Sequence, residues 1–386
     1  MKNFDFYNPV TILFGEGRIG EIKNKVPNGS IVMLTYGGGS IKRNGVYSQV
    51  MAALDGFKVI EFGGIEPNPR YETLMKAVEV ARSERVDFII AVGGGSVIDG
   101  TKFISAAIPF KGNDPWDILA MAGKVEINHA VPFGTVLTLP ATGSEMNMFA
   151  VISRNSTTEK LSFGHPLVFP KFSVLDPTVT YSLPVNQIAN GVVDAFVHVI
   201  EQYLTYPVNA NIQDRWAEGL MQTLIEVGPQ ALANPMNYDV RANVMWSCTM
   251  AVNGLLSTGV PTDWATHTIG HELTVFFGLD HAVTLSIVLP SLMREMKGEK
   301  RLKVLQFAQR VWNIEVGTED RKVDEAIEKT ESFFQAMGIK TRLSAYGITE
   351  EQLKPIFDRF EERGWKLGEM KTITPDRVKS ILLAAL

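Results

Sequence analysis

The chain has only one cysteine, Cys248, in 386 residues. A single thiol excludes a disulfide framework within the chain and is typical of proteins that work in a reducing compartment. Long apolar runs are also missing, because no stretch reaches the roughly 18 apolar residues that a membrane-spanning helix needs. Residues 1–15 alternate polar and apolar side chains and lack the apolar centre of a signal peptide. These absences predict a cytoplasmic protein that does not act in a membrane.

Basic residues are also fewer than acidic residues. The chain has 37 lysines and arginines against 42 acidic residues, a formal net charge of −5, and no basic run. This balance excludes the electrostatic footprint of a protein that binds nucleic acid or an anionic membrane surface. Apolar residues make up 45% and charged residues 20%, which is an ordinary globular composition. At this length we expect two domains of roughly 150–200 residues each.

The pattern of the chain changes near residue 185. Before this point short β-rich runs alternate with helical segments, which is typical of a parallel α/β sheet. After it the strands largely vanish and the segments read as amphipathic helices. The sequence therefore predicts a Rossmann-like α/β dinucleotide-binding domain over residues 1–185 and an all-α domain over residues 186–386. The predicted strands lie within residues 30–36, 57–62, 87–92, 135–139 and 172–176.

Two glycine clusters each follow a predicted strand. One begins at Gly37 and the other spans Gly93–Lys102. At the carboxyl ends of parallel strands, glycine lets backbone amides approach a phosphate group closely. Neither cluster matches the GxGxxG pattern, and one alone could be only a tight strand-to-helix turn. Two clusters at equivalent strand ends favour a dinucleotide, whereas Asp99 and Lys102 within the second could form only a surface ion pair.

The first cluster also bears on the choice of cofactor. NAD-binding sites often place an acid at the end of the strand that meets the adenosine ribose, where it repels a 2′-phosphate. Gly39 and Ser40 stand here instead, and Lys42 and Arg43 follow with positive charge. A hydroxyl and nearby backbone amides can hydrogen-bond a phosphate. We therefore predict a preference for NADPH.

Acidic and histidine side chains gather in the second half of the chain: Asp194, His198, His267, His271 and His281. Two pairs have the i, i+4 spacing that places side chains on one helix face. An unpaired carboxylate in an apolar helix is costly, and carboxylate with imidazole is a ligand set for zinc or iron. A lone histidine is more often a hydrogen-bonded core residue. Five such groups together favour a metal site, and they do not distinguish Zn²⁺ from Fe²⁺.

Several motifs together resemble one enzyme family. They are GGGSVIDGTK (93–102), LPATGSE (139–145), DAFVH (194–198), FGGIEPNP (62–69) and the stretch around the last three of these histidines. This set is similar to the iron-containing, or group III, alcohol dehydrogenases, in the branch of NADPH-dependent aldehyde reductases and butanol dehydrogenases. The resemblance runs along nearly the whole chain. It implies the family's fold, a nucleotide-binding α/β domain followed by a helical domain, as also found in dehydroquinate synthase.

The resemblance also assigns roles to residues. It implies one divalent metal ion bound by Asp194, His198, His267 and His281, with His271 beside the site as a proton-relay or substrate-side group. It places Asp99 at the nicotinamide end of the cofactor, so that His271 and Asp99 are the expected catalytic residues. Family members that prefer NAD carry an acid near position 39, which again favours NADPH here. The residues expected to bind the cofactor are Gly37, Gly38, Gly39, Ser40, Arg43, Gly94, Gly95, Ser96, Asp99, Thr138, Thr142 and Lys160.

We therefore expect an NAD(P)H-linked alcohol dehydrogenase or aldehyde reductase that interconverts short- to medium-chain aliphatic aldehydes and primary alcohols. Met146, Met148, Phe149 and Trp264 could form an apolar wall for the substrate tail or could be ordinary core packing. Two alternatives remain: a lyase of the dehydroquinate synthase type, and a non-catalytic sensor of NADPH or metal. We also expect a homodimer or larger homo-oligomer, in which residues 4–15 could pair as a strand across the subunit interface.

Overall fold

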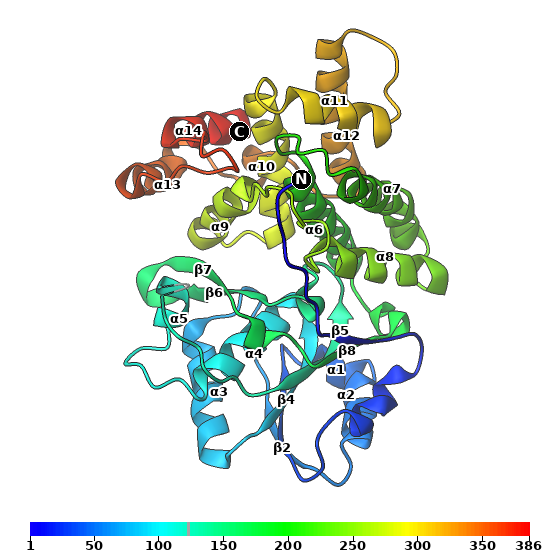
Figure 1. Cartoon of the computed structure of the whole chain (residues 1–386), viewed down its shortest axis with the longest axis vertical. Helices are drawn as coiled ribbons and strands as arrows, with labels where there is room; N and C mark the ends of the chain where they lie inside the picture. Colours follow the sequence, from blue (N-terminus) through cyan, green and yellow to red (C-terminus); the bar gives the residue numbers. More distant parts are fainter. Residues whose placement is uncertain (122–123) are drawn as a thin grey trace. The chain divides into compact units, whose positions relative to one another are not determined.

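The computed structural model describes residues 1–121 and 124–386, which divide into two compact units (Figure 1). An α/β unit contains Tyr7–Leu183 together with Met236–Thr249. A helical unit contains Met1–Phe6, Pro184–Pro235 and Met250–Leu386. The chain passes from the α/β unit to the helical unit after Leu183. Two short segments depart from this order, because Met1–Phe6 belongs to the helical unit and Met236–Thr249 to the α/β unit.

The α/β unit is built on a six-stranded sheet in the order β1-β8-β5-β4-β2-β3, and every neighbouring pair is parallel. The predicted parallel sheet is therefore confirmed. An antiparallel hairpin of β6 (Phe149–Arg154) and β7 (Glu159–Gly164) stands apart from it. The sheet strands are β1 (Thr11–Phe14), β2 (Ile31–Tyr36), β3 (Lys58–Phe62), β4 (Phe88–Gly94), β5 (Phe133–Leu139) and β8 (Phe172–Leu175).

Strand β1 forms one edge of this sheet. It pairs in parallel with β8 of the same chain, with Thr11 opposite Phe172 and Phe14 opposite Leu175. Its other edge pairs with no strand among the described residues, so the proposed pairing across a subunit interface stays a prediction. A contact between segments some 160 residues apart leaves no local signal in the sequence.

Successive side chains of the central strands enter two different cores, because they point to opposite faces of the sheet. On one face Met33, Ile89 and Ala91 pack with the buried stripe of α3. On the other face Val32 and Leu34 pack against the helices that precede and follow β2. Burial on both faces explains why these strands are nearly continuous apolar runs. The helices of this unit are α1 (Ser40–Arg43), α2 (Val46–Ala53), α3 (Tyr71–Glu84), α4 (Gly95–Ala107) and α5 (Asp117–Ala120), with most of α8 (Tyr238–Ala251).

The strand order places both glycine clusters side by side. Strands β2 and β4 are hydrogen-bonded neighbours, and the chain runs outward from them in opposite directions, to β3 on one side and to β5 on the other. Such a switch point is where open α/β sheets bind ligands, beyond the carboxyl ends of the strands. The two glycine clusters follow β2 and β4 directly.

The second unit is helical, as predicted. Its described residues contain no strand beyond an isolated bridge between Leu367 and Ile373. The central helix α6 is buried along almost its whole length. No helix among the described residues has the length and apolar character needed to cross a membrane. The remaining helices are α7 (Asn211–Ala233), α9 (Ala265–Phe277), α10 (His281–Met296), α11 (Arg301–Arg310), α12 (Glu319–Ala336), α13 (Glu350–Arg363) and α14 (Pro375–Ala384), and α6 spans Val185–Tyr203.

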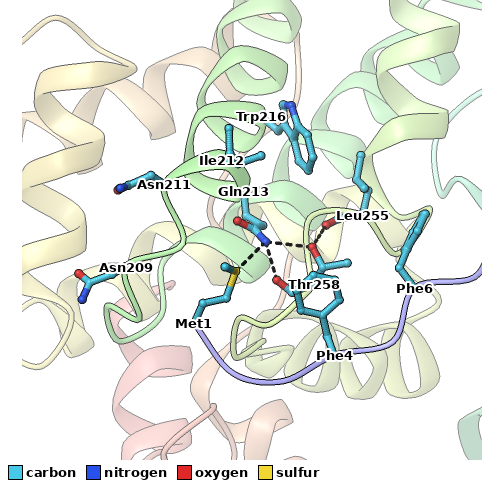
Figure 2. A pocket seen from close by; sticks show the side chains of 10 residues that line it. All are labelled: Met1, Phe4, Phe6, Asn209, Asn211, Ile212, Gln213, Trp216, Leu255 and Thr258. Carbon is cyan, nitrogen blue, oxygen red and sulfur yellow. Dashed lines mark hydrogen bonds between the residues drawn. The ribbon is translucent and has the colours of Figure 1, made fainter.

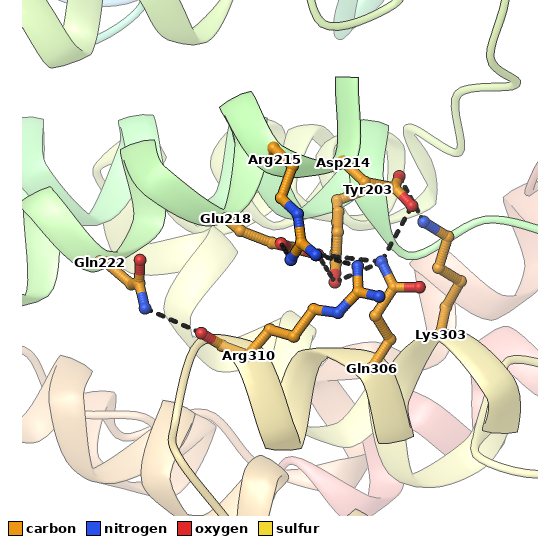
Figure 3. A network of polar contacts seen from close by, with 8 residues as sticks. All are labelled: Tyr203, Asp214, Arg215, Glu218, Gln222, Lys303, Gln306 and Arg310. Atoms are coloured by element: carbon orange, nitrogen blue, oxygen red, sulfur yellow. Dashed lines mark hydrogen bonds and ion pairs between the residues drawn. The ribbon is translucent and has the colours of Figure 1, made fainter. Parts of the chain in front are cut away.

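A polar network joins α6, α7 and α11 within this unit (Figure 3). The Glu218 carboxylate accepts hydrogen bonds from the Tyr203 hydroxyl at 2.9 Å and from Gln306 and Arg310 at 3.0 Å. Lys303 forms an ion pair with Asp214 in the same network. Because the buried acceptors are satisfied from a neighbouring helix, the network fixes how these three helices pack.

Candidate metal and cofactor sites

Three helices of the helical unit bring the predicted metal ligands together. Asp194 and His198 lie one turn apart on α6 and are both buried. His267 comes from the first turn of α9, and His281 is the first residue of α10. One donor atom from each of Asp194, His267 and His281 lies within 4.8 Å of the other two. The His198 ring centroid is 4.2 Å from that of His267, so the fourth predicted ligand borders the same cluster.

The Asp194 carboxylate fits a bound cation. Its Oδ1 atom is buried and accepts no hydrogen bond from any residue that the structure describes. The same atom lies 3.1 Å from His198 Nδ1 and 3.7 Å from His281 Nε2. A buried carboxylate oxygen without a hydrogen bond is costly, and a divalent cation removes that cost. One oxygen and three imidazole nitrogens form a donor set that suits zinc or iron.

Hydrogen bonds orient two of the imidazoles. The Nδ1 atom of His198 lies 2.8 Å from the carbonyl oxygen of Asp194, which can only accept, so this nitrogen carries the hydrogen. The Nδ1 atom of His267 contacts the buried carboxylate of Glu201. Metal-binding histidines commonly use one ring nitrogen in this way and leave the other for the ion. Burial, followed by the nearby carboxylate of Asp263, raises the pKa of Glu201 to about 8.

His271 and Trp264 border this cluster. The His271 ring centroid lies 5.6 Å from that of His281 and 6.4 Å from that of His267. The Trp264 ring centroid lies 5.5 Å from that of His267, and its backbone has a φ of 63°. A bulky residue rarely adopts this left-handed conformation, and such strain tends to occur at functional sites. The role of His271 stays a prediction.

The glycines of the second cluster are required by close packing. A Cβ atom at Gly94 would lie 2.9 Å from the Leu139 side chain, and one at Gly95 would lie 2.4 Å from Thr142 Oγ1. Thr142 therefore packs directly against the start of α4. The N-terminus of this 13-residue helix presents backbone N–H groups of the kind that bind phosphate. These contacts explain the glycines structurally and place the helix N-terminus at the switch point.

Ser96 and Lys160 are joined through Asn68, which the sequence reasoning missed. The Asn68 N–H donates to Ser96 Oγ at 3.3 Å, and the Lys160 ammonium donates to Asn68 Oδ1 at 2.8 Å. Asn68 lies in the quoted motif FGGIEPNP, which was the available signal. Thr138 is buried at the end of β5. The predicted cofactor residues of β4, α4, β5 and β7 thus gather near the carboxyl ends of the strands.

Lys42 and Arg43, the two cations beside the first glycine cluster, differ in their contacts. Lys42 forms an ion pair with Glu61 at 2.9 Å and lies over the rings of Tyr47 and Tyr36, at 4.7 and 5.0 Å from their centroids. Arg43 is exposed and forms no ion pair with any described residue. Glu61 is an acid that the sequence reasoning did not consider, because it belongs to the neighbouring strand β3. Its charge is balanced by Lys42, which leaves Arg43 as the available cation.

Lys102 is fully buried, so its interpretation as half of a surface ion pair with Asp99 is wrong. Its ammonium donates to Ser144 Oγ at 2.8 Å, to Asn147 Oδ1 at 2.9 Å and to the Phe149 carbonyl at 2.6 Å. Burial lowers the pKa of Lys102 to about 8, which keeps it charged at neutral pH.

Asp99 belongs to the same group of contacts. It accepts hydrogen bonds from the Ser144 hydroxyl and, at 2.9 Å, from the Val151 N–H. Lys102 and Asp99 therefore tie the turn after β5 to α4. Both carboxylate oxygens of Asp99 thus accept hydrogen bonds within the protein. The proposed contact of Asp99 with the nicotinamide stays a prediction.

The comparison with known families agrees with this arrangement. The model described as "Iron-containing alcohol dehydrogenase" matches residues 9–177, and "Fe-containing alcohol dehydrogenase family, C-terminal" matches residues 188–386. The chain belongs to the iron-containing alcohol dehydrogenase family. The resemblance found in the sequence is thereby confirmed.

Relatives cover the whole of this iron-containing alcohol dehydrogenase. It is 56% identical to the NADPH-dependent aldehyde reductase YqhD of Escherichia coli and 43% identical to a probable NADH-dependent butanol dehydrogenase of Bacillus subtilis, covering 100% of both chains in each case. Among solved structures, E. coli YqhD matches with a TM-score of 0.98 at 55% identity, covering 100% of this chain and 99% of that one. A Thermotoga maritima butanol dehydrogenase matches with a TM-score of 0.94 at 35% identity, with the same coverage. The expected fold and the expected alcohol dehydrogenase or aldehyde reductase class are confirmed.

Proposed function

We propose that this alcohol dehydrogenase acts as an NADPH-preferring aldehyde reductase that depends on one divalent metal ion, Fe²⁺ or Zn²⁺. Asp194, His198, His267 and His281 would hold the ion. The observation that carries the proposal is the buried Asp194 oxygen, which accepts no hydrogen bond from the described residues and faces imidazole nitrogens. The names of the relatives, an NADPH-dependent aldehyde reductase and butanol dehydrogenases, support the reaction and the substrate class.

The donor set accounts for the chemistry. A cation held by one carboxylate and three imidazoles would act as a Lewis acid toward an aldehyde carbonyl, which would favour hydride transfer from the nicotinamide. The imidazole of His271, only partly buried beside His281, would give a proton to the alcohol oxygen. In the reverse direction the same imidazole would take the proton from a primary alcohol.

Residues 1–185 would bind the cofactor and residues 186–386 the metal. The N–H groups at the start of α4, with Gly94, Gly95 and Ser96, suit the pyrophosphate. The turn from Gly37 to Ser40, with Arg43, suits a phosphorylated adenosine ribose. Gly39 has a φ of 83°, a backbone conformation that residues other than glycine rarely adopt. An acidic residue at this position would therefore be strained and would also repel the 2′-phosphate.

The Arg43 side chain gives the test of cofactor choice. With butanal and metal-loaded enzyme, we expect faster initial rates with NADPH than with NADH. Arg43→Ala should raise the KM for NADPH about tenfold or more, the value of one charge-assisted hydrogen bond, and leave the KM for NADH unchanged. Lys23→Ala, which removes an exposed cation of the same unit, serves as the control.

Each result of this assay has a distinct meaning. An equal loss with both cofactors in Arg43→Ala would show that Arg43 does not recognise the 2′-phosphate. Turnover by the wild type with NADH alone would refute the preference for NADPH and keep the dehydrogenase. Binding of NADPH without turnover of any aldehyde would favour the sensor alternative.

Partly exposed apolar side chains support an aliphatic substrate. Phe149 is 49% exposed, and Met146 and Met148 are only partly buried, so core packing does not account for them. Unbranched methionine side chains adapt to tails of different length. We propose short- to medium-chain aldehydes such as butanal. The single cysteine, Cys248, is buried, and one cysteine cannot form a disulfide within the chain, which suits the proposed cytoplasmic location.

An apolar hollow supports the proposed homodimer or larger homo-oligomer. Figure 2 shows the N-terminal residues Met1, Phe4 and Phe6 around a hollow of about 480 Å³, with Ile212 and Trp216 of α7 on its other side. Met1 is 63% exposed and Ile212 is 58% exposed. Contiguous apolar surface of this kind commonly marks a contact between proteins.

Charge placed on this surface should separate the subunits. The double variant Ile212→Glu and Trp216→Glu should shift the molar mass from that of an oligomer to that of a monomer, because burying two carboxylates at an interface is costly. Size-exclusion chromatography with light scattering measures this mass. Val316→Glu, at an 86% exposed position of the same unit, should change nothing. A wild-type chain that is monomeric at micromolar concentration would contradict the proposal.

A further inference from the structure

Glu201 contacts His267, one of the predicted metal ligands. It is buried on α6, one turn beyond His198 on the same helix face. Its Oε2 atom contacts Nδ1 of His267, and its Oε1 atom accepts the N–H of Thr266 at 2.6 Å. One carboxylate thus holds both the imidazole and the backbone at the start of α9.

The contact determines which ring nitrogen faces the other ligands. In its ionised form the Glu201 carboxylate can only accept, so Nδ1 of His267 then carries the hydrogen and Nε2 presents its lone pair. This is the form that a metal ion requires. The carboxylate is also a stronger acceptor than the backbone carbonyl that orients His198, and it makes the His267 imidazole a more basic ligand.

A buried ion-pair cluster supports Glu201 from behind. The Asp263 N–H donates to the Glu201 carbonyl at 2.9 Å, and the Asp263 Oδ1 atom accepts the N–H of Ala265 at 2.9 Å. The Lys300 ammonium lies 2.6 Å from Asp263 Oδ2 and 2.8 Å from Glu369 Oε2. Lys300 balances part of the charge of Asp263, and burial together with that charge raises the pKa of Glu201.

We propose that Glu201 is a positioning residue that fixes His267 in the tautomer without a hydrogen on Nε2 and thereby sets the affinity for the metal. This inference rests on the proposed metal site. The N–H groups of Asp263 and Thr266, which donate to the carbonyl and the carboxylate of Glu201, keep this residue in place. Glu201 itself contacts neither the substrate nor the ion.

The variant Glu201→Gln tests this role of Glu201, because glutamine has almost the same shape as glutamate. The buried Thr266 N–H needs an acceptor, so the amide oxygen of the new side chain should turn toward it. The NH₂ group then faces Nδ1 of His267 and donates to it. This arrangement should move the ring hydrogen to Nε2, so that this nitrogen cannot bind a metal ion.

Long-range ¹H–¹⁵N correlation spectra on the full-length, metal-free chain with ¹⁵N-labelled histidine report this tautomer directly. A spectrum of His267→Ala assigns the His267 signals. We expect the Nδ1–H form in the wild type and the Nε2–H form in Glu201→Gln. Glu226→Gln, an exposed position on α7, should give the wild-type spectrum. A wild-type His267 in the Nε2–H form would overturn the proposal.

Competition with a chromophoric chelator then measures the Kd for Zn²⁺. Glu201→Gln should bind Zn²⁺ about 10- to 100-fold more weakly than the wild type and Glu226→Gln. Unchanged affinity with a reversed tautomer would overturn the role assigned to Glu201. If the wild type itself binds neither Zn²⁺ nor Fe²⁺, the proposed metal site fails and the role toward the metal fails with it. The tautomer measurement separates that failure from a mistaken contact between Glu201 and His267.

Discussion

His267→Ala should lower kcat/KM for butanal reduction by about 1,000-fold or more, because loss of Lewis-acid catalysis removes several kcal/mol of transition-state stabilisation. The residue supplies one of the three donors that lie within 4.8 Å of one another. We expect the purified variant to contain substoichiometric metal. Adding Fe²⁺ or Zn²⁺ to chelator-stripped protein should restore the activity of the wild type but not that of the variant.

Two further variants keep this result interpretable. Asp194→Asn conserves side-chain shape and removes the negative charge, so it should lose metal and activity even if His267→Ala is misfolded. His129→Ala removes an exposed histidine of the α/β unit and should behave as the wild type. Circular dichroism and melting temperature report whether each variant is folded. Retained metal and full activity in a folded His267→Ala would show that His267 is not a ligand.

Lys102→Met should destabilise the α/β unit by about 3–5 kcal/mol, because it removes one partner from a buried ionic cluster. Three acceptors, from Ser144, Asn147 and Phe149, would lose their donor. Burial raises the pKa values of Asp99 and Glu145, and both residues would lose the nearby Lys102 charge that opposes this rise. The melting temperature should fall on the order of 10 °C.

The matched control for this prediction is Lys76→Met, an exposed lysine on α3 of the same unit, which should melt within about 2 °C of the wild type. NADPH should also bind more weakly to Lys102→Met, because the turn that Lys102 ties to α4 belongs to the proposed cofactor groove. A Lys102→Met protein with unchanged melting temperature would show that the cluster does not hold the turn.

The stability of the wild type and that of Lys102→Met should also depend differently on pH. The pKa of Lys102 is lowered from 10.5 to about 8 in the folded protein. Between these values the unfolded chain binds a proton that the folded chain does not, so this lysine makes the free energy of unfolding rise with pH. The difference in stability between the wild type and Lys102→Met should therefore widen from pH 8 to pH 10. Urea unfolding at both values measures it.

The sequence alone was enough for features that depend on neighbours along the chain. Asp194 and His198 are four residues apart in one helix, so their common face follows from helical geometry. The buried parallel strands follow from continuous apolar runs, and the turns after β2 and β4 follow from their glycines. Whole-chain motifs then identified the family, and with it the candidate ligands on α9 and α10.

The tertiary structure alone decided the contacts between residues far apart in the sequence. Glu201 and His267 are 66 positions apart, and Lys102 reaches Phe149 across 47 positions. Lysine is usually a surface residue, yet Lys102 is buried and Lys42 is paired with Glu61 of a neighbouring strand. Local periodicity specifies the face of an element, whereas the packing of distant elements determines what that face meets. For this reason the chemistry of the site was readable in the sequence, and the groups that orient and balance its residues were not.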